Sequence, residues 1–158
     1  MQNSFVRELL KSDLFLPWVI VGLMLVTLMA AVVVCQSMGA QIQHPLAEDA
    51  RELIRAVLYI IAIVTFPMTN LIRYIQLRLN QTMPGSKPAK SRYLLTVIVS
   101  LSLIESVGLF GLVMFVLGDD FNTLYIFTGL SALGLYLYRP KQAEYDEIVA
   151  AIASQQKH

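Results

Sequence analysis

YLLTVIVSLSLIESVGLFGLVMFVLG, residues 93–118, is a long apolar run with a single ionisable side chain, Glu105. Arg92 precedes the run and Asp119 follows it, so Glu105 lies near its midpoint. A helix rises about 1.5 Å per residue and the hydrocarbon core of a bilayer is about 30 Å thick. The run therefore predicts a membrane-spanning helix with Glu105 near the bilayer centre. An ionisable group at that depth typically marks an ion path or a relay.

The composition agrees with a membrane protein. The chain has 158 residues, of which 56% are hydrophobic and 15% charged, and its mean hydropathy is +0.62. It is too apolar for an ordinary soluble domain and short enough for one unit, so we expect a single membrane domain over residues 1–158. The net charge is +1, which gives no basic excess for a nucleic-acid partner.

Three further apolar runs accompany the first one. They are separated by the polar segment QSMGAQIQHP, by a long basic loop and by the turn GDDFN. At both ends of the chain, apolar residues recur at helical spacing among polar ones. We therefore predict an all-α protein, an integral membrane four-helix bundle with a short amphipathic helix at each terminus. The predicted spans are about 14–35, 54–77, 93–117 and 121–138, and residues 139–158 form a tail.

The distribution of basic residues predicts the orientation. The N-terminal segment, the loop between the second and third spans, and the tail together carry ten of the twelve Lys and Arg residues, and the other connections carry Arg51 and Arg55. Positive residues concentrate on the cytoplasmic side of membrane proteins. We therefore expect a multi-pass protein of the inner (cytoplasmic) membrane, with both termini and the tail in the cytoplasm.

Glu105 is the candidate ion-binding residue. Pro67 lies inside the second predicted span, where it should kink the helix. Counting from the charged ends of each run, Thr65 should lie at about the depth of Glu105. Thr65, Ser102 and Ser106 would then supply hydroxyls for H⁺ or Na⁺ binding at the carboxyl group. The alternative is a permanently neutral Glu105 that only holds two helices together.

The glycines and the basic residues predict packing and binding contacts rather than a catalytic role. Gly108 and Gly111 allow close helix packing, either within one bundle or against copies of the chain or a partner. The basic loop and its flanks would contact anionic lipid headgroups, or else dock a soluble partner. The basic residues concerned are Arg73, Arg78, Lys87, Lys90 and Arg92.

The string LIESVGLFGLVMF, residues 103–115, resembles the ion-carrying helix of the c-type ring subunits of rotary ATPases. In that family a mid-membrane acid binds H⁺ or Na⁺, and a small residue and an aromatic-Gly-Leu-Val run follow it. The resemblance implies that Glu105 is the ion site and that residues 108–112 form the following motif. The chain differs in having no glycine in its second span and a long basic loop after it. The four-span pattern as a whole resembles small uncharacterised bacterial membrane proteins.

No motif for an enzyme, a cofactor or a metal centre occurs in the sequence. A single buried acid lacks the partner that general acid–base catalysis needs, so we expect no enzymatic activity and no cofactor. Cys35 stands alone and should pack as a small apolar residue. Two hypotheses remain: a subunit of a membrane complex that binds or relays an ion at Glu105, and a non-catalytic assembly subunit. Both involve the lipid bilayer and a membrane-protein partner or self-association.

Overall fold

The computed structural model describes residues 13–157, and this part of the chain is helical with no β-strand. The predicted all-α class is confirmed. The predicted N-terminal amphipathic helix falls almost entirely in residues 1–12, which lie outside the described residues. The helices and their bounds are α2 (Phe15–Met38), the short 3-10 helix η1 (Gly39–Gln41), α3 (Glu48–Thr82), α4 (Ala89–Val116), α5 (Phe121–Leu137) and α6 (Gln142–Gln155).

Each of the four predicted spans is a helix. The segment Phe15–Gln41 and the helices α3 and α4 are long and apolar enough to cross a membrane, as judged by length and composition. The helix α5 is shorter, with 17 residues. The helix α3 extends beyond the predicted 54–77 at both ends, because its polar flanks continue in helical conformation. The predicted C-terminal amphipathic helix is α6, whose Tyr145 and Ile148 are buried.

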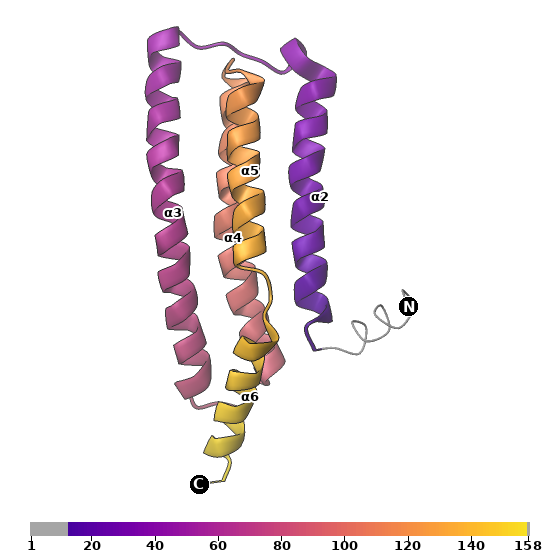
Figure 1. Cartoon of the computed structure of the whole chain (residues 1–158), viewed down its shortest axis with the longest axis vertical. Helices are drawn as coiled ribbons and strands as arrows, with labels where there is room; N and C mark the ends of the chain where they lie inside the picture. The colour runs from indigo at the N-terminus through magenta and orange to yellow at the C-terminus, as the bar shows by residue number, and fades with distance from the viewer. Residues whose placement is uncertain (1–12, 158) are drawn as a thin grey trace.

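The helix α4 lies in the middle of the molecule and packs against α2, α3 and α5 (Figure 1). Glycines allow this close approach. A Cβ atom at Gly108 would lie 3.1 Å from Ser131 on α5, and one at Gly111 would lie 3.0 Å from the Leu124 carbonyl oxygen. Gly108 and Gly111 therefore lie at packed helix contacts within the chain, and packing against a copy of the chain or a partner stays a prediction. The Ser131 hydroxyl adds a hydrogen bond to the Ile104 carbonyl at 3.0 Å.

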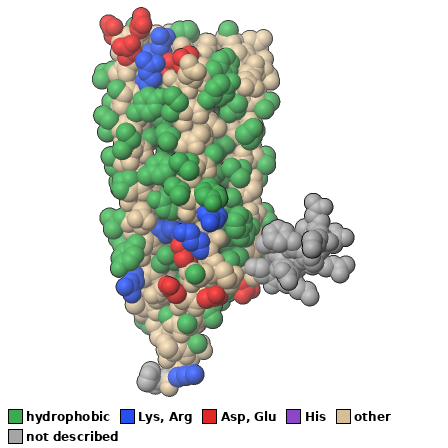
Figure 2. Space-filling view, viewed as in Figure 1, with side chains coloured by type: hydrophobic (Ala, Val, Ile, Leu, Met, Phe, Trp, Pro, Cys, Tyr) green, Lys and Arg blue, Asp and Glu red, His purple; other side chains and the backbone are tan. Residues whose placement is uncertain are grey.

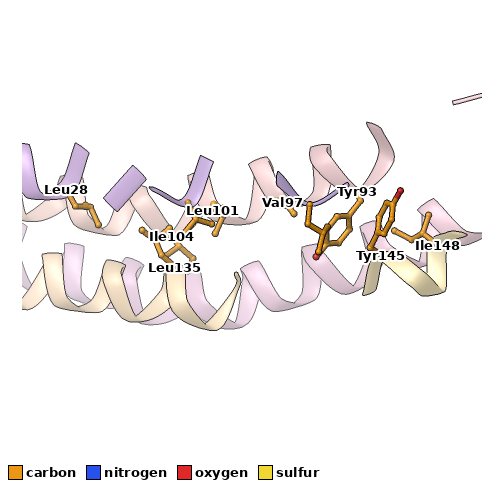
Figure 3. Packing of buried hydrophobic residues seen from close by; sticks show 10 residues of the cluster. Leu28, Tyr93, Val97, Leu101, Ile104, Leu135, Tyr145 and Ile148 are labelled. Carbon is orange, nitrogen blue, oxygen red and sulfur yellow. The ribbon is translucent and has the colours of Figure 1, made fainter. Parts of the chain in front are cut away.

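The largest buried cluster runs along this packing (Figure 3). Leu28, Leu101, Ile104 and Leu135 fill the space between α2, α4 and α5. At one end the rings of Tyr93 and Tyr145 meet at a centroid distance of 5.9 Å, which joins α6 to α4. The helix α6 is thus part of the core of its own chain.

The surface carries an apolar band between two charged ends (Figure 2). The sequence of α3 has no charged residue between Arg55 and Arg73, a length of about 27 Å at 1.5 Å per residue. Many large apolar side chains of α2 and α3 are exposed there, including Leu23, Val26 and Ile63. A band of this height is close to the thickness of a bilayer core.

The two ends of the molecule are built differently. At the end opposite α6, Arg55 donates two hydrogen bonds to the buried Asp119 carboxylate, at 2.9 and 3.2 Å. Gly118 adopts a φ of +92°, and a Cβ there would lie 2.7 Å from Pro45. These contacts fix the 39–48 connection against the end of α4. The other end, where α6 lies beside the 83–88 loop, is called the α6 end below.

Candidate functional site

The register of α3 against α4 is set by contacts at both ends of the pair. At the α6 end, Asn80 donates to the Thr96 hydroxyl at 2.8 Å and to the Arg92 carbonyl at 3.2 Å. At the opposite end, Arg55 binds Asp119. From the Asn80–Thr96 contact, Thr69 is eleven residues back along α3 and Glu105 is nine residues forward along α4. Thr69 and Glu105 therefore lie within about 3 Å of the same depth.

Glu105 and Thr69 each place an unpaired oxygen in the protein interior. The Glu105 side chain is half-buried, and its Oε1 atom is buried without a hydrogen-bond partner among the described residues. Thr69 is completely buried, and its Oγ1 atom is likewise unpaired. Buried polar atoms are nearly always hydrogen-bonded, so each of these unpaired oxygens calls for an explanation. Thr96 contacts α3, and Glu105 is nine residues or about two and a half turns from it, so Glu105 leaves α4 on the side away from α3 and Thr69.

The hydroxyl groups that we expected around Glu105 are either bonded to carbonyls of their own helix or exposed. Thr65 lies one turn before Thr69, and its hydroxyl donates to the Ile61 carbonyl of its own helix at 2.7 Å. The Ser106 hydroxyl donates to the Leu103 carbonyl at 2.6 Å, and Ser102 is exposed. The register therefore brings Thr69, rather than Thr65, to the depth of Glu105. Ion binding by Thr65, Ser102 and Ser106 stays a prediction.

The helix α3 continues through Pro67 without interruption. Near the proline, the Tyr138 hydroxyl donates to the Phe66 carbonyl at 2.9 Å, which ties the end of α5 to the middle of α3. The predicted kink stays a prediction. By the same register Phe66 lies about 7.5 Å, or more than one turn, from the depth of Glu105.

A charged cluster closes the α6 end. The Arg73 side chain donates from Nη2 to Glu144 Oε2 at 2.6 Å and from Nε to Glu144 Oε1 at 3.3 Å. The Tyr93 hydroxyl donates to Glu144 Oε2 at 2.9 Å and accepts from the Lys141 backbone N–H at 2.8 Å. Arg73 is buried, yet its Nη1 atom has no hydrogen-bond partner among the described residues. A cavity of about 360 Å³ opens beside Arg73, Lys141 and Glu144.

The five basic residues expected to contact lipid divide into two groups. Arg73 is held by Glu144, and Arg92 donates to the carbonyls of Asn80, Met83, Gly85 and Lys87, so it shapes the 83–88 loop. The other three, Arg78, Lys87 and Lys90, are exposed. Arg78 lies over the Tyr74 ring at 5.7 Å. These three are the residues free to meet headgroups or a partner.

Sequence reasoning missed Thr69, Gln76 and Glu144. A signal was present, because residues 69, 73, 76 and 80 are polar and recur at the spacing of one helical face. Such a polar face on an otherwise apolar helix indicates a polar neighbour or water. No local pattern in the sequence predicts the contact between Arg73 and Glu144, because it joins residues 71 positions apart.

Comparisons of the chain with protein-family models, with characterised proteins and with solved structures found no match. Within residues 13–157 no three His, Cys, Asp or Glu side chains are grouped so as to hold a metal ion. The described residues contain a half-buried carboxyl group in the apolar part of α4 and, separately, a polar face on α3 that ends at the charged cluster of Arg73 and Glu144.

Proposed function

We propose that this chain is a small polytopic membrane protein, a subunit of a larger membrane complex, which binds or relays H⁺ at Glu105. The observation that carries the proposal is the buried, unpaired Oε1 atom of Glu105 in the apolar band. In a bilayer such a carboxyl group is stable as the neutral acid, and it becomes a proton carrier where a polar neighbour lowers the penalty of ionisation.

Several features support insertion into a membrane. The apolar band has the height of a bilayer core, and three helical segments have the length and composition to cross it. We propose the inner membrane of a bacterial cell as the location. Of the twelve basic residues, ten lie in the terminal segments and the basic loop with its flanks, so the α6 end faces the cytoplasm in this proposal.

The exposed part of Glu105 suggests a partner. Its neighbours on α4, Ser102 and Leu109, are exposed, as are Leu95, Ile98 and Val113 further along the same helix. A carboxyl group at the edge of an exposed stripe would meet lipid at a depth where polar groups are unfavourable. Another membrane subunit, or a second copy of the chain, would cover it.

The alternative is a structural or assembly subunit in which a neutral Glu105 only packs helices. A glutamic acid with that role would donate a hydrogen bond across the helix interface. The interhelical hydrogen bond of α4 near this depth instead joins Ser131 to the Ile104 carbonyl. The close packing of Gly108 and Gly111 also holds α4 in place without Glu105. These contacts favour the proton-exchanging role.

Carbodiimide labelling of Glu105 in membranes over pH 5 to 9 tests the proposal. Because carbodiimide reacts with the protonated carboxyl, labelling should fall as the pH rises, and Glu105→Gln should abolish it. Added Na⁺ should leave the labelling unchanged; protection by Na⁺ would identify Na⁺ as the ion instead. Labelling that is absent, or equal at every pH, would support the structural alternative.

A further inference from the structure

The cavity beside the Arg73–Glu144 pair lies where α3 passes the end of α5 and the start of α6. Its volume of about 360 Å³ is that of a small-ligand site. Apolar residues of α3 and α5 form part of its wall, and four polar residues complete it: Asn70, Arg73, Lys141 and Glu144. The cavity therefore combines a polar and an apolar lining, as a site for an amphipathic ligand requires.

The charge of the cavity favours an anion. Arg73 and Lys141 are cationic and Glu144 is the acid among the lining residues, so one positive charge is in excess. The Glu144 carboxylate already accepts hydrogen bonds from Arg73 Nε and Nη2 and from the Tyr93 hydroxyl. The acid is thus satisfied by its neighbours, and the excess positive charge is left for a ligand.

The cationic residues also have donors to spare. A guanidinium carries five N–H groups, and Arg73 directs Nε and Nη2 to Glu144 and to the Arg139 carbonyl. Its Nη1 atom has no hydrogen-bond partner among residues 13–157, although Arg73 is only 4% exposed. The exposed Lys141 and Asn70 add an ammonium and an amide. Donors of these kinds bind the oxygens of a phosphate group.

The position of the cavity points to a lipid phosphate. Arg73 ends the uncharged stretch of α3, and Lys141 follows the end of α5, so the cavity lies at the border of the apolar band, where basic side chains gather (Figure 2). Phospholipid headgroups meet a membrane protein at this border.

An apolar surface continues from the cavity into the band. Ile63 is seven residues before Asn70 on α3, and Leu133 is four residues before Leu137 on α5, so each lies on the same face as a cavity residue. Ile63 is 69% exposed and Leu133 is 51% exposed. These faces suit an acyl chain attached to a phosphate in the cavity, whereas a free phosphate would make no use of them.

We propose that the cavity binds the phosphate group of an anionic phospholipid through Lys141, Asn70 and Arg73, with the acyl chains along the exposed faces of α3 and α5. The site goes beyond the proposed function, because Glu105 leaves α4 on the side away from α3 and takes no part in it. It rests only on the insertion of the apolar band into a bilayer. The exposed Lys87 and Lys90 lie outside the cavity.

Native mass spectrometry of the full chain in detergent micelles, titrated with phosphatidylglycerol, tests the site. One lipid should bind per chain. Lys141→Gln removes the ammonium but keeps the backbone N–H that binds the Tyr93 hydroxyl, so it should weaken binding by about tenfold without loss of the fold. Lys141→Arg should restore most of the affinity. The matched control is Lys90→Gln, which removes the same charge outside the cavity and should bind like the wild type.

Two competitors identify the source of the phosphate. Phosphatidylcholine with the same acyl chains has no net charge, so it should bind about fivefold more weakly. Inorganic phosphate at millimolar concentration should not displace phosphatidylglycerol. Displacement by inorganic phosphate, or equal losses in Lys141→Gln and Lys90→Gln, would overturn the lipid site.

Flotation of the full chain with vesicles of phosphatidylglycerol and phosphatidylcholine, after a carbonate wash, separates this inference from the proposed function. We expect the chain to float. A chain that floats but forms no one-to-one complex with phosphatidylglycerol would overturn the lipid site and leave the proposed function standing. A chain that does not float would overturn both.

Discussion

Arg73 and Glu144 form an ion pair that joins α3 to α6, with Nη2 and Oε2 2.6 Å apart and side chains only 5% and 18% exposed. The ion pair holds the Arg73 side chain buried, within about one helical turn of the depth of Glu105. The Tyr93 hydroxyl shares the Glu144 carboxylate, so three helices meet at one acid. The cluster fixes α6 against α3 and α4.

Glu144→Gln should markedly destabilise the protein. It leaves the Arg73 guanidinium buried without a counter-ion, and removal of one partner from a buried pair costs about 3 to 5 kcal/mol. The measurement is thermal unfolding in detergent micelles. Asp146→Asn is the control on the same helix, because that side chain is exposed. Equal melting temperatures for both variants would contradict a structural role for the pair.

Release of α6 should also expose a protease site. The Lys141 backbone N–H is bound by the Tyr93 hydroxyl, which holds the chain just before α6. Loss of Glu144 or of the Tyr93 hydroxyl should therefore speed tryptic cleavage after Lys141. The measurement is the rate of appearance of the fragment that ends at Lys141, compared among wild type, Glu144→Gln and Tyr93→Phe. Unchanged rates would mean that α6 stays docked without these contacts.

Asp120 should make the stability depend on pH in the acid range. It caps α5, and the backbone N–H of Thr123 is the main cause that lowers the pKa of the Asp120 carboxyl group. A lowered folded-state pKa stabilises the fold above the unfolded value of about 3.9, and this contribution is lost as the pH falls through the folded value.

The test is the free energy of unfolding of wild type and Asp120→Ala between pH 2 and 6. The variant should be less stable near pH 6 by about 0.5 to 2 kcal/mol, the usual effect of losing a helix cap. The difference should shrink toward pH 2. A gap that is constant over this range would show that the charge of Asp120 does not contribute.

The helices could be predicted from the sequence, but the register between them could not. The apolar runs identify α2 to α5, because burial in lipid or core requires long uncharged segments, and the prolines at residues 17, 45 and 88 mark the starts of α2, α3 and α4. Counting to the midpoint between Arg55 and Arg73 placed Thr65 beside Glu105. That count treats Arg73 as an end of the run, whereas Glu144 holds Arg73 inside the protein and shifts the register by one turn.

Only part of the candidate site could be predicted from the sequence. Glu105 stands out because one acid interrupts an apolar run. The depth of Thr69 relative to Glu105 depends on the pairing of two helices, and the contact of Glu144 with Arg73 depends on a tail that folds back. Contacts between distant residues leave no periodic signal, so composition and spacing do not reveal them.

Gly134→Ala should destabilise the protein, whereas Gly129→Ala should not. A Cβ at Gly134 would lie closer than 2.5 Å to the branched Ile104 side chain, but one at Gly129 would meet open space. Overpacking of this kind costs about 1 to 3 kcal/mol. Replacing an unhindered helical glycine by alanine gains about 0.5 to 1 kcal/mol. Chemical unfolding in micelles compares the two variants on one helix. A similar effect of both would contradict the packing of α5 on α4.

Tyr145 should make the stability fall at alkaline pH. Burial, and then the hydrogen bond to Asp13 at 2.8 Å, raise the pKa of this phenol to about 12. Its unfolded value is about 10, so the folded state holds the proton more tightly. A raised folded-state pKa gives stability that is fully present below pH 10 and is lost as the pH rises toward 12.

The measurement is the free energy of unfolding from pH 8 to 12 in wild type, Tyr145→Phe and Asp13→Asn. Tyr145→Phe removes the titrating phenol, so its stability should fall less between pH 10 and 12 than that of the wild type. Asp13→Asn keeps the phenol but removes the adjacent negative charge, so its fall should be intermediate. A wild-type slope in Tyr145→Phe would mean that another group governs the alkaline unfolding, and that α6 does not hold the phenol out of water.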